Sequence, residues 1–226
     1  MDRPPHEIPV IDLFAGPGGL GEGFSAYSTD EQLSFRIRLS IEYEAKAWRT
    51  LRLRSFFRQF DREDVPAEYY EYIRGEIDEE ELFGNHPEQF ASADTEAWHA
   101  ELGKVPFAEL NTRISEALNG SKDWLLIGGP PCQAYSLVGR SRLLGGARNE
   151  IADQELSTDE AEKTARAAFD SDHRHLLYRE YLKIIAVHQP SVFVMENVKG
   201  MLSSAHRSKA IFESILQDLS ELTCPH

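Results

Sequence analysis

The sequence predicts an α/β fold built on an open, largely parallel β-sheet. Short runs of apolar and β-branched residues alternate along the chain with segments of helical spacing, which is the pattern of strands joined by crossover helices. Two of the strand-like runs pass directly into glycine-rich turns. The 226 residues are 41% hydrophobic, so one domain of ordinary size can bury a core of this kind.

The first two strands and the helices after them give the clearest signals. Residues 8–14 predict an apolar, β-branched strand that leads into the turn AGPGGLGEG, and residues 19–28 then open a helix. Residues 35–41 alternate as a strand does and end at Glu42. A helix is expected over residues 44–57. Its candidate buried positions are Ala45, Trp48, Leu51 and Leu53.

Residues 55–100 differ from the rest of the chain. They are rich in Glu, Asp, Tyr and Phe and contain no strand-like run, so we expect a helical insertion on the edge of the domain. The aromatic residues of this segment favour a small local core over a binding surface. They are Tyr69, Tyr70, Tyr72 and Phe83.

The second half of the chain continues the alternation of strands and helices. Residues 109–119 predict a helix closed by Gly120, and residues 124–127 predict a third strand that ends in the turn GGPPCQ. Residues 133–171 are largely polar and predict a mobile loop region. A fourth strand is expected over residues 191–195.

Two more helices complete the predicted fold. Residues 175–189 have a firm helical period that ends before Pro190, and a last helix is expected around residues 206–222. One side of the first of these helices is apolar. It carries Leu176, Leu177, Tyr181, Ile184 and Ile185.

Charge and composition exclude several classes of protein. Lys and Arg number 24 against 38 Asp and Glu, and the formal net charge of −14 argues against a general nucleic-acid coat but not against a local basic site. No apolar run approaches the roughly 20 residues that span a bilayer, and the first residues lack a secretory pattern. Two cysteines, Cys132 and Cys224, are too few for a disulfide framework or a four-ligand zinc site. We expect a cytoplasmic protein without a metal site.

Four of the predicted strands end in residues that suit a ligand site. These ends are the glycine turn after residue 14, Glu42, the segment GGPPCQ, and Glu196 with Asn197. Because ligands of open α/β sheets bind beyond the carboxyl ends of the strands, the coincidence predicts one site. The glycine turn lets backbone amides approach a ligand, and a carboxylate about 20 residues further on can accept hydrogen bonds from ribose hydroxyls. This pattern indicates nucleotide-type binding without separating NAD from S-adenosylmethionine, although Pro17 departs from the GxGxxG pattern of NAD proteins.

Cys132 and Glu196 are the candidates for catalysis. Two prolines before Cys132 restrict the backbone, so its thiol is presented in a fixed position, as a nucleophile requires. A single cysteine is more often a small buried hydrophobe, but its place beside GGPP and Gln133 at a strand end favours the nucleophile. Glu196 follows the apolar run SVFVM and is expected to be partly buried, which suits a proton donor. The alternative for Glu196 is an acid that complements a helix N-terminus.

Taken together, these motifs resemble those of the C5-cytosine DNA methyltransferases, in the order that the family has them. DLFAGPGG is similar to the family's cofactor turn, IEYEAKA to its second motif, GGPPCQAYSLVGR to its Pro-Cys-Gln motif, and MENVKG to its Glu-Asn-Val motif. The resemblance implies a Rossmann-like methyltransferase sheet, S-adenosylmethionine as the cofactor, and double-stranded DNA as the substrate.

The resemblance also implies a role for individual residues. Glu42 would hold the ribose hydroxyls and Tyr43 would lie against the adenine. The family's acid near the adenine is indistinct here, with Glu101 as the first choice and Asp94 as the rival. The other cofactor-binding positions would be Phe14, Ala15, Gly16, Gly18, Gly19, Pro130 and Leu177. The DNA-binding positions would be Gln133, Ser136, Arg140 and Arg142, on a loop that closes over the DNA.

In the implied mechanism, the Cys132 thiolate attacks C6 of a flipped-out cytosine, Glu196 contacts N3, and C5 accepts the methyl group. Family members continue past the Glu-Asn-Val motif with further strands and a target recognition domain. Residues 1–226 are therefore expected to be the N-terminal part of a catalytic domain, either truncated or completed by a second polypeptide, with truncation favoured. An open sheet edge would then favour self-association.

Two other functions stay open at this point. One is a non-catalytic subunit of a split methyltransferase that binds S-adenosylmethionine or a partner chain. The other is a nicotinamide-dependent oxidoreductase, which only the glycine turn and Glu42 suggest.

Overall fold

The structure is a computed structural model that describes residues 6–27, 33–129, 177–196 and 220. It divides into two compact units. The first contains residues 1–128 and 190–194, and the second contains residues 129–189 and 195–226.

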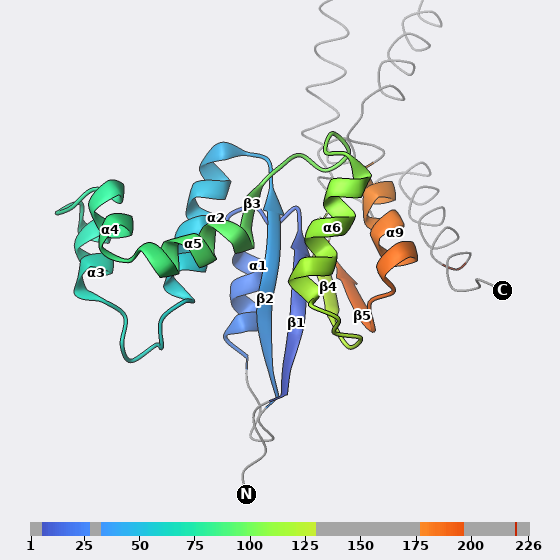
Figure 1. The fold of residues 1–226 in the computed structure, drawn as a ribbon, viewed down its shortest axis with the longest axis horizontal. Helices are drawn as coiled ribbons and strands as arrows, with labels where there is room; N and C mark the ends of the chain where they lie inside the picture. Colours follow the sequence, from blue (N-terminus) through green and yellow to red (C-terminus); the bar gives the residue numbers. More distant parts are fainter. Residues whose placement is uncertain (1–5, 28–32, 130–176, 197–219, 221–226) are drawn as a thin grey trace, which may run out of the picture. The chain divides into compact units, whose positions relative to one another are not determined.

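A five-stranded sheet organises the first unit, with the strand order β3-β2-β1-β4-β5 (Figure 1). The pairs β1–β2, β1–β4 and β2–β3 are all parallel, so the predicted open α/β sheet is confirmed. The central position of β1 explains why its second half is buried and mostly apolar, with Val10, Ile11 and Leu13 fully buried. The strands are β1 (His6–Leu13), β2 (Leu33–Glu42), β3 (Ala97–His99), β4 (Leu125–Gly128) and β5 (Val192–Met195).

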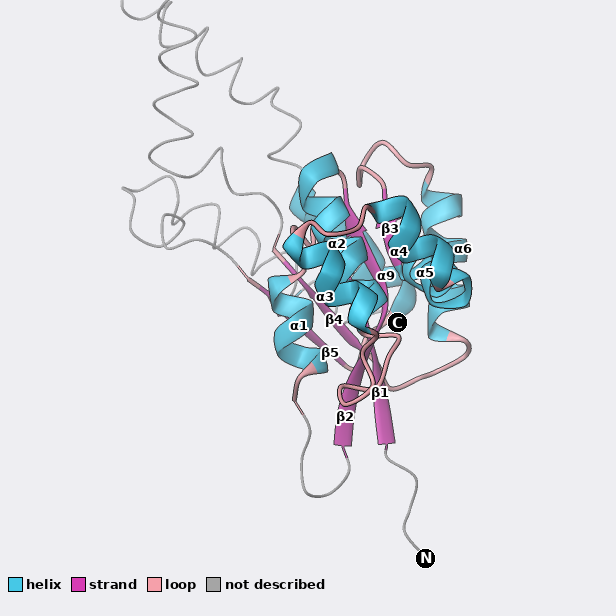
Figure 2. Cartoon of the chain, turned by 90° about the vertical axis from the view of Figure 1, so that its left-hand side faces the viewer, coloured by secondary structure: helices cyan, strands magenta, loops and turns pink. Residues whose placement is uncertain are grey.

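Helices cover both faces of this sheet. Helices α1 (Gly19–Ser25) and α6 (Phe107–Leu118) lie on opposite faces (Figure 2). Leu20 and Phe24 of α1 pack against a core cluster of the sheet. That cluster consists of Val10, Ile37, Leu125 and Ile127. Helix α6 ends at Asn119, whose left-handed φ of 46° stops the helical hydrogen bonding close to the predicted end.

Residues 55–100 contain three short helices and one strand. The helices are α3 (Ala67–Arg74), α4 (Glu79–Asn85) and α5 (Pro87–Glu96). The expectation that this segment holds no strand was wrong, because β3 pairs with the end of β2. With only three residues, β3 is too short for an alternating pattern to be recognised.

The helices of this segment share a small core, as the aromatic residues predicted. Phe83 is buried there with Phe56, Leu82 and Ala93, while Tyr69 and Tyr72 are partly buried against them. Tyr70 is the exception, since 45% of its surface is exposed.

Helix α2 (Ala45–Phe57) starts where the Glu44 carboxylate accepts the Ala47 amide at 2.7 Å. Of its four predicted buried positions, only Leu51 is fully buried; Ala45 is exposed, and Trp48 and Leu53 are half-buried. Phe56 was missed, because the C-terminal half of α2 packs on the core of α4 and α5 rather than continuing along the sheet.

In the second unit, the structure describes helix α9 (Leu177–His188). Leu177, Tyr181 and Ile184 are buried as predicted, and Ile185 is half-buried. Leu176 and the predicted helix around 206–222 lie outside the described residues, apart from Ser220.

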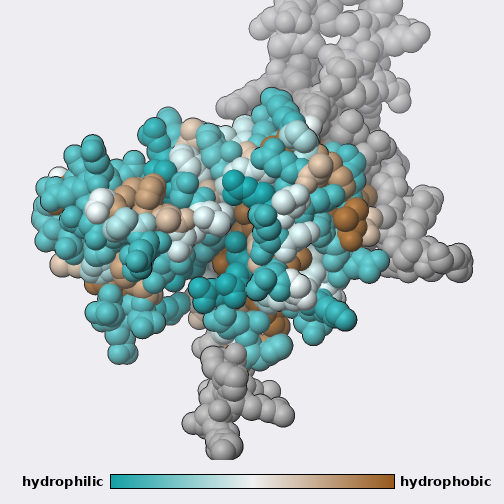
Figure 3. All heavy atoms as spheres, viewed as in Figure 1, coloured by the Kyte–Doolittle hydropathy of each residue, from teal (hydrophilic) through white to brown (hydrophobic). Residues whose placement is uncertain are grey.

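One face of the described part of the chain is largely polar. On the face shown in Figure 3, hydrophilic residues predominate and apolar side chains gather only in small patches. Among the described helices, none combines the length and the apolar character that crossing a membrane requires.

Candidate functional site

The carboxyl ends of β1, β2, β3 and β4 meet at one edge of the sheet, because neighbouring strands are parallel. The chain passes from β1 to β2 on one side and reaches β4 on the other side of β1. Strand order therefore reverses at β1, and such reversals are where open α/β sheets bind ligands. The turns after β1 and β4 border this candidate site.

The turn after β1 has an unusual backbone. Phe14 has a positive φ of 56°, which is uncommon for a residue with a side chain and which concentrates at functional sites. Gly18 has a φ of 88°, and an added Cβ there would lie 2.8 Å from Leu51 Cδ1, so glycine is required for the turn to pack on α2. Around Gly16 and Gly19 an added Cβ would meet nothing within 4 Å, so the backbone borders open space.

Glu42, the last residue of β2, joins this turn. The residue is 7% exposed; its carboxylate Oε2 accepts the Gly16 amide at 2.8 Å and Oε1 accepts the Glu44 amide at 2.7 Å. Each carboxylate oxygen has two lone pairs, so both can accept a further hydrogen bond. The two predicted parts of the cofactor site, 26 residues apart in sequence, are thus brought together.

The structure separates the two candidates for the acid near the adenine. Glu101 follows the end of β3, next to Ala100, whose amide donates to the Glu42 carbonyl at 3.0 Å. Asp94 instead lies on α5 and pairs with Arg52 at 3.6 Å. Glu101 is therefore the candidate at the carboxyl edge, where it also forms an ion pair with Lys104 at 2.8 Å. Tyr43 is 54% exposed at the same edge.

The end of β4 is as restricted as the turn after β1. An added Cβ at Gly128 would lie 2.1 Å from the Leu13 carbonyl oxygen, so no side chain fits where β4 ends against β1.

Within the second unit, Gly129 lies against Glu196. An added Cβ at Gly129 would be 2.6 Å from Glu196 Oε2 and 2.8 Å from the Glu196 carbonyl oxygen. This contact brings the start of the Pro-Cys-Gln segment next to the first residue of the Glu-Asn-Val segment. Most predicted residues of that segment and its loop lie outside the described residues. They are Pro130, Cys132, Gln133, Ser136, Arg140 and Arg142.

Glu196 itself is exposed, so the expectation that it is partly buried was wrong. The apolar run before it indicated a covered strand, but β5 ends the strand order of the sheet, and Val192, Phe193 and Val194 are exposed as well. Leu177, the last of the predicted cofactor positions, belongs to the second unit and is buried.

A buried acid next to the site was missed by the sequence analysis. Asp12, near the end of β1, is 1% exposed, and neither carboxylate oxygen has a hydrogen-bond partner. Burial raises the pKa of Asp12 to about 7, although the positive charge of Arg58 acts in the opposite direction. The Gly21 amide also faces this carboxylate and lowers its pKa, but its geometry falls short of a hydrogen bond. An acid inside an apolar strand is the sequence signal that could have marked it.

A polar cavity of about 370 Å³ lies elsewhere, beside the first half of β2. Arg58 lines it and forms ion pairs with Glu22 and Glu96. We place the functional site at the carboxyl edge instead, because the motif residues converge there and not on this cavity. No group of three metal-ligating side chains occurs in the part of the chain that the structure describes.

Comparison with known proteins places these features in context. The sequence model of the C-5 cytosine-specific DNA methylases matches residues 160–223. The chain is 28% identical to the type II methyltransferase M.Bpa9945I of Bacillus paralicheniformis, over 94% of this chain and 45% of that protein. It is 27% identical to the type II methyltransferase M.AquIA of a Picosynechococcus strain, over 95% of this chain and 57% of that protein. The chain thus spans about half the length of these curated relatives.

Among solved structures, the methyltransferase EhMeth of Entamoeba histolytica aligns with 96% of this chain and 44% of its own, at 14% identity and a TM-score of 0.42.

Proposed function

Because the chain belongs to the C-5 cytosine-specific DNA methylase family, we propose that it binds S-adenosylmethionine at the carboxyl edge of its sheet and methylates cytosine at C5 in DNA. The observation that carries the proposal is the Glu42 carboxylate, which joins the glycine turn to the end of β2.

The residues at this edge suit the proposed cofactor. Open space beside Gly16 and Gly19 leaves room for a ligand against the backbone of the turn. Glu42 has free lone pairs that would accept the ribose hydroxyls, and the exposed ring of Tyr43 would lie against the adenine. S-adenosylmethionine, when bound, supplies an electrophilic methyl group on a positively charged sulfur. The remaining residues that we propose around it are Phe14, Ala15, Gly18, Glu101, Pro130 and Leu177.

We further propose that Cys132 is the nucleophile and that Glu196 activates the base. Cytosine C5 is a weak nucleophile, so bond formation between Cys132 Sγ and C6 is needed to move electron density to C5. Glu196 would hydrogen-bond N3 and stabilise that adduct, and its contact with Gly129 supports its position beside the Cys132 segment. After C5 gains the methyl group, loss of the C5 proton to a base restores the double bond and expels the Cys132 thiolate.

The substrate must leave the DNA stack for this chemistry, because C6 is out of reach within a duplex. We propose that Gln133, Ser136, Arg140 and Arg142 contact the DNA around the flipped base. The two arginines would provide local positive charge in a chain whose net charge is −14.

Covalent trapping tests this proposal. The chain would be mixed with S-adenosylmethionine and a panel of duplexes that contain 5-fluorocytosine, whose fluorine cannot leave C5 as a proton does. We expect a stable protein–DNA adduct in denaturing gels, located on Cys132 by mass spectrometry. The Cys132→Ser variant should give none, and Cys224→Ser, which alters the other cysteine, should behave as wild type. An adduct that persists in Cys132→Ser would contradict the assignment of the nucleophile.

A further inference from the structure

His99 lies at the proposed cofactor edge, but neither the sequence motifs nor the mechanism uses it. It is the last residue of β3 and stands opposite Glu42 in the β2–β3 register. Its side chain is exposed, yet it makes two specific contacts. A ring nitrogen lies 3.0 Å from the Tyr43 carbonyl oxygen, and the ring stacks on Trp48 with a centroid distance of 4.6 Å and an angle of 18°. Since a carbonyl can only accept, the imidazole is the donor of this hydrogen bond.

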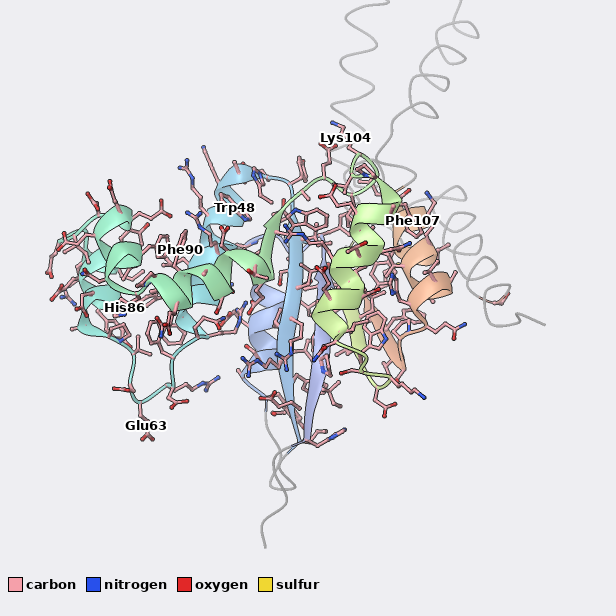
Figure 4. The ribbon with its side chains drawn as sticks, viewed as in Figure 1. Trp48, Glu63, His86, Phe90, Lys104 and Phe107 are labelled. Atoms are coloured by element: carbon pink, nitrogen blue, oxygen red, sulfur yellow. The ribbon has the colours of Figure 1, made fainter. Side chains whose placement is uncertain are left out.

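Trp48 is itself fixed between two elements. Its indole Nε1 donates to the Ala97 carbonyl at 2.9 Å, so a side chain of α2 is bonded to the backbone of β3. Trp48 is labelled in Figure 4. The Arg52 guanidinium, one helical turn further on, lies 4.5 Å from the Trp48 ring centroid. The Trp48 ring, on which His99 stacks, is therefore held in a fixed orientation.

Arg52 in turn is held by α4 and α5. It pairs with Glu79 at 2.7 Å and with Asp94 at 3.6 Å, and it lies 5.2 Å from the Phe83 ring and 5.4 Å from the Phe90 ring. Helices α4 and α5 are thereby connected, through Arg52 and Trp48, to the imidazole at the carboxyl edge.

We propose that His99 is a positioning residue for the cofactor, which holds the Glu42–Tyr43–Glu44 segment by its hydrogen bond to the Tyr43 carbonyl and its stacking on Trp48. The segment needs such support because the Glu44 amide donates to Glu42 Oε1, so a shift of this backbone would move the carboxylate that faces the ribose. The inference rests on the proposed function, since it assumes that Glu42 and Tyr43 contact S-adenosylmethionine.

The test is titration calorimetry of the full chain with S-adenosylmethionine, with three variants. His99→Ala removes both contacts, His99→Gln keeps a donor that can reach the Tyr43 carbonyl, and His6→Ala is the matched control, an exposed histidine at the start of β1. We expect the Kd to rise about tenfold in His99→Ala, the size that one lost hydrogen bond of this kind would give. His99→Gln should recover most of that loss, and His6→Ala should bind as wild type.

A second readout separates positioning from general stability. Because His99 is exposed, its loss should leave the melting temperature close to that of wild type. The tryptophan fluorescence change on cofactor binding should be present in wild type, reduced in His99→Ala and absent in Trp48→Phe. If wild type binds and His99→Ala binds equally well, or if His99→Gln restores nothing, the inference is overturned while the proposed function stands. If wild type does not bind S-adenosylmethionine at all, the proposed cofactor site is overturned and this inference with it.

Discussion

Glu42 is held in place by two backbone amides, one on each side-chain oxygen. A side chain that is already ordered loses little freedom when it binds, so this carboxylate is preorganised for the ribose hydroxyls that we propose it accepts. Asp12 is the opposite case at the residue scale. Its carboxylate is buried and unsatisfied, so its ionisation opposes folding rather than assisting binding.

Replacing Glu42 tests the first of these residues. In Glu42→Gln one carboxylate oxygen becomes an amide nitrogen, which cannot accept from the Gly16 or Glu44 amide or from a ribose hydroxyl. Hydrogen bonds to charged groups contribute about 1.5–3 kcal/mol, so the affinity for S-adenosylmethionine should fall about 10- to 100-fold by calorimetry. The control is Glu44→Gln, which alters the cap of α2 but leaves the cofactor contacts intact. Equal losses in both variants would contradict the role of Glu42.

The pH dependence of folding tests Asp12. Its pKa is about 7 in the folded chain and near 3.8 when unfolded, so between these values the unfolded carboxyl ionises while the folded one keeps its proton. Its contribution to stability is present below about pH 4 and is lost as the pH rises to about 7, by up to about 1.4 kcal/mol for each pH unit. Asp12→Asn removes this titration. The free energy of unfolding of the variant should therefore rise relative to that of wild type across this pH range, and the difference should become constant above it. Urea denaturation at pH 5, 6, 7 and 8 measures the difference, and the exposed Asp64→Asn should run parallel to wild type.

At the scale of elements, the strands that rest on sequence patterns of several residues were predicted correctly, whereas contacts between elements were not predicted. β1, β2, β4 and β5 were predicted because each is a run of apolar residues, whereas β3 has three residues and was missed. The glycine turn and Glu42 were recognised because parallel strands must place their ends together. The surroundings of His99, Trp48 and Asp12 were not predicted, because the residues around them lie on other elements and no local sequence pattern indicates such contacts.

The core that α2 shares with α4 and α5 gives a prediction at this scale. Phe83 is 8% exposed and stacks on Phe90 with a centroid distance of 4.4 Å, so Phe83→Ala should lower the free energy of unfolding by about 3–5 kcal/mol. Tyr70→Ala, at an exposed aromatic position of α3, should lower the free energy of unfolding by about 0.5 kcal/mol or less. Similar losses in both variants, measured by urea denaturation, would mean that this core does not form.

At the scale of the whole molecule, β5 is the last strand in the order that the described residues form, and Val192, Phe193 and Val194 are exposed. An edge strand of this kind offers exposed apolar side chains to another chain. This agrees with the self-association that an open edge predicts, which stays a prediction.

Sedimentation velocity at several concentrations checks that prediction. Wild type should show an average mass that rises with concentration, and Val192→Lys should reduce the rise, because a charge on an edge strand opposes pairing. Val192 is 57% exposed, and Val187 on α9 is 53% exposed, so Val187→Lys is the matched control and should leave association unchanged. A sharp monomer at all concentrations of wild type would contradict the prediction.

The pairing of β1 with β4 also has a consequence for the order in which the chain is assembled. Val10 pairs with Leu125, so the 114 residues between these two partners must be synthesised before the centre of the sheet can close. During translation, β1 and β2 can join early, but the Gly128–Leu13 contact that closes the sheet beside the glycine turn must wait for β4 to emerge. Long-range pairings of this kind fold slowly. The nascent chain should therefore acquire its affinity for S-adenosylmethionine late, only after the strand that precedes Gly129 has left the ribosome.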